Sequence, residues 1–188
     1  MTSVGDRQDD PEARAAREIR RGRYISLATS SSEGEPWCAP VAYVETEQEE
    51  LLFASSVYSR HARDLSDTGC IAGAIFDSTR LSAEVDGVQL AGECLRIPDD
   101  RVPQYGEMFA TRYCVKAHEV PQEWNEVRAA RWMSSSSLGL FAIKVTKVYV
   151  LDQNEYARTG SDKRLELRVA RTWEFLRRCW ALHSDLRV

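Results

Sequence analysis

The chain has 188 residues, with 25 Lys and Arg against 29 Asp and Glu, a net charge of −4 at pH 7 and 43% hydrophobic residues. This length and composition fit one domain with a single core, and no compositional break divides the chain. The acidic balance argues against a general nucleic-acid-binding protein, which usually carries a basic face or tail. We therefore expect the ligand to be a small molecule.

Residues 1–23 place acidic residues before basic ones and contain no apolar core segment. A secretory signal or a membrane span needs such a segment, so we expect a cytoplasmic protein that does not enter a membrane. Asp9, Asp10 and Pro11 are typical of a helix start, and Gly22 is typical of a helix end. Residues 1–23 are thus predicted to hold an N-terminal helix.

The cysteines are odd in number, widely spaced and without a Cys-x-x-Cys pair. Three of them lie in strand-like surroundings, which predicts buried, reduced, structural thiols instead of a disulfide framework or a zinc site. The five are Cys38, Cys70, Cys94, Cys114 and Cys179.

Residues 24–152 alternate between short β-like segments and polar turns, such as the run SSSEGE. One short helix interrupts them, beginning at Ser59, ending near Asp67 and closed by Gly69. Because most connections are too short for crossover helices, this region predicts an antiparallel barrel. The strands are predicted at residues 24–30, 36–45, 51–54, 70–76 and 88–97.

Residues 98–137 read as a helical insertion in the barrel domain 24–152. One helix opens near Pro98 and another at Pro121, where Trp124 and Trp132 recur at helical spacing. Large aromatic side chains in such a helix usually belong to the core or to an interface.

Residues 138–151 alternate in polarity, with Lys144 pointing outward, and are predicted to complete the barrel. Residues 153–188 are predicted to form a polar loop followed by an amphipathic helix at 170–182. The apolar stripe of that helix, which includes Trp173, predicts packing on the barrel or on a partner subunit.

The most informative segment follows the third predicted strand. Ser55 and Ser56 end that strand, and Ser59, Arg60 and His61 open the next helix. Hydroxyl groups, unpaired helix N–H groups and a guanidinium all favour negative charge, so the pattern predicts a phosphate or carboxylate site. A solvated helix start, with Ser59 as N-cap and an exposed arginine, would give the same sequence.

The succession of ISLATS, PWCAPVAYV, LLFASSVYSRHARDL, CIAGAIF and GVQLAGE resembles the FMN-binding split β-barrel of the pyridoxamine 5'-phosphate oxidase-like superfamily. The resemblance covers most of residues 24–152 and is similar to a branch of short bacterial members. It implies an α+β protein, mainly β with helices, built on an antiparallel split barrel.

Residues 54–62 resemble the family's aromatic-Thr-Asn-x-x-Ser-Arg-Lys segment, and GVQLAG resembles the strand that crosses the flavin. The resemblance implies that the strand end meets the flavin and the helix start meets the ribityl phosphate. The residues implied to bind FMN are Ala54, Ser55, Ser56, Ser59, Arg60, His61 and Gln89.

The resemblance further implies an FMN-dependent oxidoreductase that passes hydride or electrons between the flavin and a small-molecule substrate. A homodimer with the cofactor between its subunits is implied as well. The flavin carries the redox chemistry, so no catalytic side chain is expected. Candidates for stacking on the ring or the substrate are Tyr43, Tyr105, Tyr113 and Trp132.

Three departures from the family pattern argue against vitamin B6 oxidase activity. His61 stands where Lys is usual, the second strand lacks the Arg and Lys of the true oxidase, and no Arg-x-His-Asp-Arg-like segment is present near the C-terminus. Three alternatives stay open: a haem protein with His61 as iron ligand, a deazaflavin reductase, and a non-catalytic ligand-binding dimer.

Overall fold

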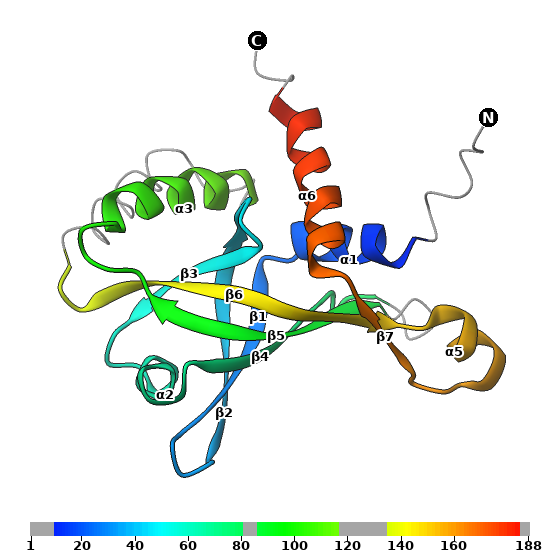
Figure 1. Cartoon of the computed structure of the whole chain (residues 1–188), viewed down its shortest axis with the longest axis horizontal. Coiled ribbons are helices and arrows are strands. Elements are labelled where there is room, and N and C mark those ends of the chain that lie inside the picture. Colours follow the sequence, from blue (N-terminus) through cyan, green and yellow to red (C-terminus); the bar gives the residue numbers. More distant parts are fainter. Residues whose placement is uncertain (1–9, 81–85, 117–134, 185–188) are drawn as a thin grey trace.

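Seven antiparallel strands form one sheet in the order β3-β2-β1-β4-β5-β6-β7, and a further pairing between β3 and β6 closes six of them into a barrel (Figure 1). The computed structural model describes residues 10–80, 86–116 and 135–184. The predicted antiparallel split barrel is confirmed. The strands are β1 (Tyr24–Ser30), β2 (Pro36–Glu45), β3 (Glu50–Ser56), β4 (Cys70–Phe76), β5 (Gly87–Arg96), β6 (Leu138–Leu151) and β7 (Arg164–Leu167).

Helices lie around the barrel and at its ends (Figure 1). The first begins and ends as predicted, because the Asp10 carboxylate accepts hydrogen bonds from the first-turn N–H groups and Gly22 caps the other end. The described helices are α1 (Pro11–Arg21), α2 (Arg60–Thr68), α3 (Val102–Lys116), α5 (Gln153–Thr159) and α6 (Val169–Ser184).

The main core fills the barrel. Alternation along each strand turns one set of side chains inward, as with Ile25 and Leu27 of β1, which have no exposed surface. Trp173 and Leu176 of α6 are equally buried and join this core. The prediction that the apolar stripe of the last helix packs on the barrel is therefore confirmed.

A second, smaller core lies on the outside of the barrel beneath α3. Phe109 of the helix is buried against Val44 of β2, Leu52 of β3 and Leu140 of β6. Strands β2, β3 and β6 are thus apolar on both faces where α3 covers them, which explains their continuous runs of hydrophobic residues. The predicted second helix of the insertion, with Trp124 and Trp132, lies outside the described residues.

The polar segment after β6 differs from its prediction as a loop. The Asp152 side chain accepts from the N–H of Glu155 to start α5, and Gly160 ends that helix in a left-handed conformation with φ of 72°. The following segment forms β7, which pairs with β6 from Leu151 to Val148. Capping residues define both ends of this helix, which has no apolar stripe. Hydrophobic periodicity in the sequence could therefore not predict it.

The expectation that the cysteines are buried is also wrong for two of the three in strands. Cys94 is buried, whereas Cys38 and Cys70 are exposed, and none of these three forms a disulfide. Outward positions alternate with inward ones along a strand, and Cys38 and Cys70 fall on outward positions.

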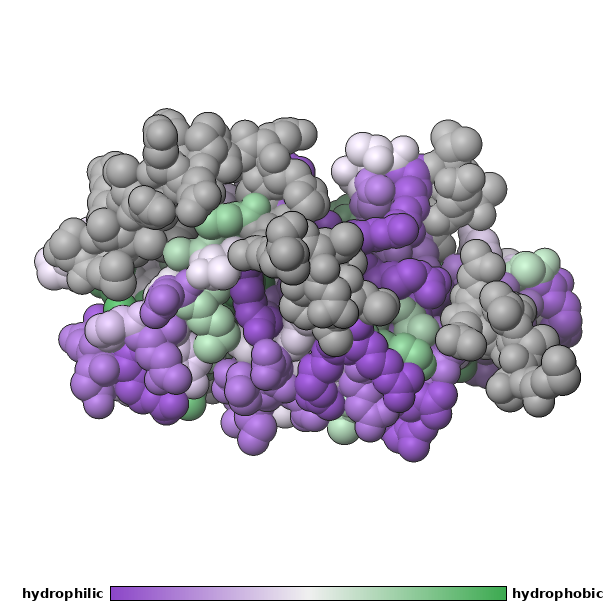
Figure 2. All heavy atoms as spheres, turned by 90° about the horizontal axis from the view of Figure 1, so that it is seen from above, coloured by the Kyte–Doolittle hydropathy of each residue, from purple (hydrophilic) through white to green (hydrophobic). Residues whose placement is uncertain are grey.

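Hydrophilic residues dominate the described surface on the side shown in Figure 2, where apolar residues form small separate groups. Among the described helices, none is long and apolar enough to cross a membrane.

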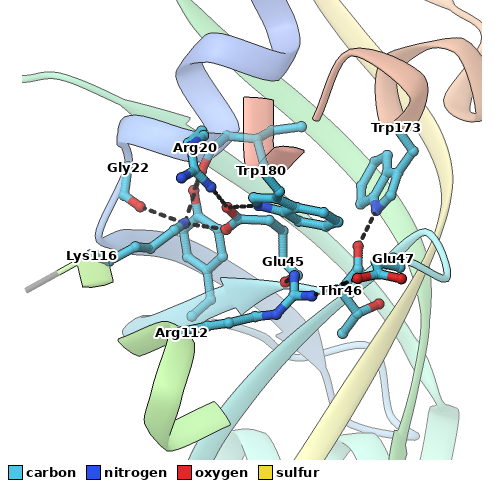
Figure 3. Close-up of polar contacts among 11 residues, drawn as sticks. Arg20, Gly22, Glu45, Thr46, Glu47, Arg112, Lys116, Trp173 and Trp180 are labelled. Carbon is cyan, nitrogen blue, oxygen red and sulfur yellow. Dashed lines mark hydrogen bonds and ion pairs between the residues drawn. The ribbon is translucent and has the colours of Figure 1, made fainter. Parts of the chain in front are cut away.

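A buried ionic cluster joins the helices to the barrel (Figure 3). The Glu45 carboxylate, at the end of β2 and 2% exposed, lies 2.6 Å from Lys116 Nζ and 3.3 Å from Arg20 Nη1. Trp180 of α6 donates its indole N–H to the same carboxylate at 3.4 Å. Because α1, α3 and α6 each send a donor to one acceptor, their positions on the barrel are coupled.

Lys116 is fully engaged in this cluster. Its ammonium group donates to the carbonyl oxygens of Ile19 and Gly22, each at 3.0 Å, and lies 3.9 Å from the centre of the Tyr43 ring. Burial lowers the pKa of Lys116, and the Glu45 carboxylate opposes that shift. These contacts, together with the ion pair to Glu45, compensate for the water that the Lys116 ammonium group loses on burial.

We expect Lys116→Met to lower the free energy of unfolding by about 3 kcal/mol, because it leaves the Glu45 carboxylate buried with fewer partners. Urea unfolding would measure the change, with Lys144→Met on the exposed face of β6 as control, expected to stay within about 0.5 kcal/mol of the parent. Equal stabilities of the Lys116 variant and the parent would show that the cluster does not hold the helices.

Candidate functional site

The candidate site lies where β3 ends and α2 begins. Strand β3 is held by its pairing with β2 on one side and with β6 on the other. Its last residues pair with the start of β6, Ser55 opposite Gly139 and Ser56 opposite Leu138. The N–H of Val57 donates to the carbonyl of Ser137 at 3.0 Å, which extends this pairing past the strand end. The serine hydroxyls are therefore held at a defined edge of the barrel.

The start of α2 matches its prediction. Ser59 is the N-cap, in extended conformation, and its hydroxyl accepts from the N–H of Ala62 at 3.3 Å. Gly69 closes the helix in a left-handed conformation with φ of 66°. The first turn of any α-helix leaves N–H groups without helical partners, so this end of α2 carries partial positive charge.

Arg60 has a partner that local sequence patterns did not indicate. Its Nη2 lies 3.0 Å from Glu35 Oε2, and its guanidinium carbon lies 4.9 Å from the centre of the Trp37 ring. Glu35 is the last residue of the turn between β1 and β2, and Trp37 is the second residue of β2. The Arg60 side chain remains 34% exposed, so the guanidinium is held at the surface and stays accessible.

His61 is buried, with 8% of its surface exposed. Its Nε2 lies 2.8 Å from the hydroxyl of Ser55 and 3.0 Å from that of Ser59. Burial lowers the pKa of His61, although the Asp64 charge opposes the shift. The imidazole is therefore neutral at neutral pH and ties the end of β3 to the cap of α2.

A second buried contact orients α2 on the barrel. The Thr29 hydroxyl of β1 donates to the Asp64 carboxylate at 2.7 Å, and both side chains are buried. Two polar contacts, one through His61 and one through Asp64, thus fix the helix whose first turn lies at the candidate site. The sequence analysis missed Thr29, Glu35, Trp37 and Asp64, since no local pattern links them to α2.

The structure brings six of the seven predicted cofactor-binding residues together, from Ala54 to His61, and places Gln89 elsewhere in the chain. Gln89 pairs with Ala74 on one side and Tyr149 on the other, whereas Ser55 pairs with Gly139. Along β6, Gly139 and Tyr149 are separated by about 30 Å at the usual rise of a strand. Gln89 instead lines an open pocket of about 330 Å³.

Among the described residues of this chain, the predicted stacking aromatics do not surround the site. Tyr43 has no exposed surface and donates its hydroxyl to the Ile19 carbonyl at 2.6 Å. Tyr105 and Tyr113 pack in the outer core beneath α3. Trp132 lies outside the described residues.

Comparison with known proteins links this geometry to a family. A sequence model of the pyridoxamine 5'-phosphate oxidases matches residues 11–152. Among curated sequences, a UPF0306 protein of Pasteurella multocida is 25% identical over 137 residues, which cover 71% of this chain and 91% of that protein.

Solved structures share the fold. A haem-binding protein from Mycobacterium smegmatis superposes with a TM-score of 0.61 at 20% identity, over 88% of this chain and 61% of that chain. The haem storage protein HutZ from Vibrio cholerae superposes with a TM-score of 0.53 at 18% identity, over 71% of this chain and 90% of that chain. The split barrel, and the sequence match that extends from α1 to the end of β6, show that the chain belongs to the pyridoxamine 5'-phosphate oxidase family.

Proposed function

We propose that this protein is an FMN-binding flavoprotein and an oxidoreductase that passes hydride or electrons between the flavin and a small-molecule substrate. The observation that carries the proposal is the junction of β3 with α2, where an accessible guanidinium stands at a helix N-terminus in a member of this family. When bound, the flavin would supply the redox chemistry.

The groups at the junction suit the phosphate end of FMN. Arg60 offers a planar guanidinium that can pair with phosphate oxygens, and the first turn of α2 adds backbone N–H groups. The hydroxyls of Ser55 and Ser59 are additional hydrogen-bonding groups at the same place. One cation, helix N–H groups and hydroxyls make a donor set matched to a phosphate monoester.

His61 has a positioning role in this proposal. Its Nε2 contacts the hydroxyls of Ser55 and Ser59, so the ring orients both groups toward one edge of the barrel. Because burial keeps the imidazole neutral, His61 does not add the second positive charge that a lysine would supply at this position. Arg60 is then the side-chain cation on which phosphate binding depends.

The outer face of the sheet supports the proposed homodimer. Across four strands, one row of outward positions holds only small side chains: Cys38, Ala28, Ala72 and Ala91 pair in that order. The exposed side chains of Phe76 and Leu95 lie on β4 and β5 of the same sheet. The row carries no charge across these four strands and ends at Lys147 of β6. Such a face suits a second copy of this chain, which would bring further residues to the cofactor.

Haem binding is the second candidate, favoured by the two structural neighbours described as haem proteins. The geometry of His61 argues against it as the iron ligand, because its Nε2 already contacts two hydroxyls and the ring is buried. A deazaflavin cofactor would use the same phosphate-binding groups, and competition between the two cofactors would distinguish them.

Purified protein should be yellow, release FMN on denaturation and rebind it with quenching of flavin fluorescence. Arg60→Ala should weaken FMN binding by about 10- to 100-fold, the loss expected for one charged hydrogen-bonding partner. Arg63→Ala, on the exposed side of the same helix, is the control and should bind like the parent. A protein without measurable affinity for FMN would refute the proposal.

Haem titration followed by Soret absorption should give the same spectra for the parent and for His61→Gln, since the imidazole Nε2 is engaged inside the protein. A Soret band that is present in the parent and lost in the variant would assign the iron to His61 and favour the haem candidate.

Ala72→Arg should convert a dimer into a monomer of unchanged secondary structure, because it buries an unpaired charge in the proposed interface. Sedimentation velocity would measure the change, and Ser161→Arg in the exposed loop before β7 is the control for added charge. A parent that sediments as a monomer, or a dimer that survives Ala72→Arg, would contradict the proposed interface.

A further inference from the structure

The Arg60 guanidinium already forms an ion pair with a carboxylate of the same chain. The Glu35 carboxylate lies 3.0 Å from its Nη2 and so engages one of the donors that a phosphate could use. We propose that Glu35 is a specificity-determining residue: its carboxylate occupies the phosphate-binding arginine, and only a ligand with a strongly charged phosphate monoester displaces it. This inference rests on the proposed function and assigns the selectivity of that site.

The hairpin that carries Glu35 is built to present it. The Ser31 hydroxyl accepts from the N–H groups of Glu33 and Glu35 at 3.3 and 3.2 Å, and the N–H of Ser31 donates to the Glu35 carbonyl at 3.0 Å. Gly34 takes a left-handed conformation with φ of 84°, which permits this tight turn. The backbone of Glu35 is therefore fixed, and only its side chain needs to move when the ion pair opens.

Trp37 keeps the guanidinium in place when Glu35 leaves. Its ring lies under Arg60 at 4.9 Å, and a cation–π contact of this kind does not depend on the carboxylate. Arg60 can therefore exchange one anion for another without losing its orientation. The hairpin thus contributes a competing carboxylate and, two residues later, an aromatic support.

The difference in charge between the ligand's phosphate and the Glu35 carboxylate decides which of them pairs with Arg60. At pH 7 a phosphate monoester carries a charge of about −1.5 to −2 and three acceptor oxygens, whereas a carboxylate carries −1. The Glu35 side chain is 68% exposed, so its release from Arg60 restores hydration at little cost. A dianionic phosphate therefore displaces Glu35, but a ligand that lacks the phosphate gains nothing from Arg60 and leaves the ion pair closed.

Glu35→Gln tests this directly in the full-length protein. FMN should bind about two- to fivefold more tightly than to the parent at low ionic strength, because one competing exposed ion pair is removed. Riboflavin, which lacks the phosphate, should bind the parent and the variant equally. The gain for FMN should shrink at about 1 M salt, where the Debye length is about 3 Å.

Two controls isolate the contact from general charge effects. Glu33→Gln removes the same charge two residues away in the same turn, and should leave FMN affinity unchanged. In an Arg60→Gln background, Glu35→Gln should no longer tighten FMN binding, since the two residues act as a pair.

The outcomes separate this inference from the function on which it rests. If the parent binds FMN and Glu35→Gln binds it no more tightly, or if Glu33→Gln tightens binding equally, Glu35 does not set the selectivity and the inference is wrong, while the flavoprotein proposal stands. If neither the parent nor any variant binds FMN, the proposed function fails, and the inference fails with it.

Discussion

Strand β3 is the constraint on which the rest of this structure depends. It pairs with β2 on one side and with β6 on the other, and the second ladder turns an open sheet into a barrel. The same ladder fixes the depth at which Ser55 and Ser56 leave the sheet and α2 begins. Because the side-chain period of a strand is two, a slip of one residue would move Phe53 out of the core and the polar strand end into it. The buried core and the candidate site are therefore specified by one register.

The site combines a rigid part with an adjustable one. His61 and Asp64 are buried polar residues with hydrogen-bonding partners on β3 and β1, and such contacts fix α2 because each unpaired group would be costly. Arg60 lies one residue before His61 but points to the surface, where its partner Glu35 is itself exposed. Adjacent residues on one helix turn thus serve opposite purposes, the imidazole holding the backbone and the guanidinium staying free to exchange partners.

The sequence predicted what depends on neighbours along the chain and missed what depends on contacts across it. Ser59, Gly69 and the alternation in β6 act locally, so the start and end of α2 and the barrel strands were predictable. Glu35 and Arg60 are 25 positions apart in the sequence, and no local pattern near either residue predicts their contact. The exposure of Cys38 was mispredicted because its position on the outward face depends on the register of β2, which a run of apolar residues does not reveal.

Charge at the junction follows from these placements and separates this chain from the family pattern it resembles. A lysine after the arginine would give two cations, whereas here the residue is a neutral, buried histidine and the arginine is paired with a carboxylate. The charges of the Arg60 and Glu35 side chains cancel while the two form an ion pair, and the N-terminus of α2 supplies the remaining positive potential. In the proposed site, attraction for a phosphate comes from the backbone N–H groups in the first turn of α2 and from the Arg60 guanidinium, which is paired with Glu35 of the hairpin. In the proposed site, the barrel would fix where the phosphate binds, and the carboxylate of Glu35 would set how much negative charge the ligand must bring.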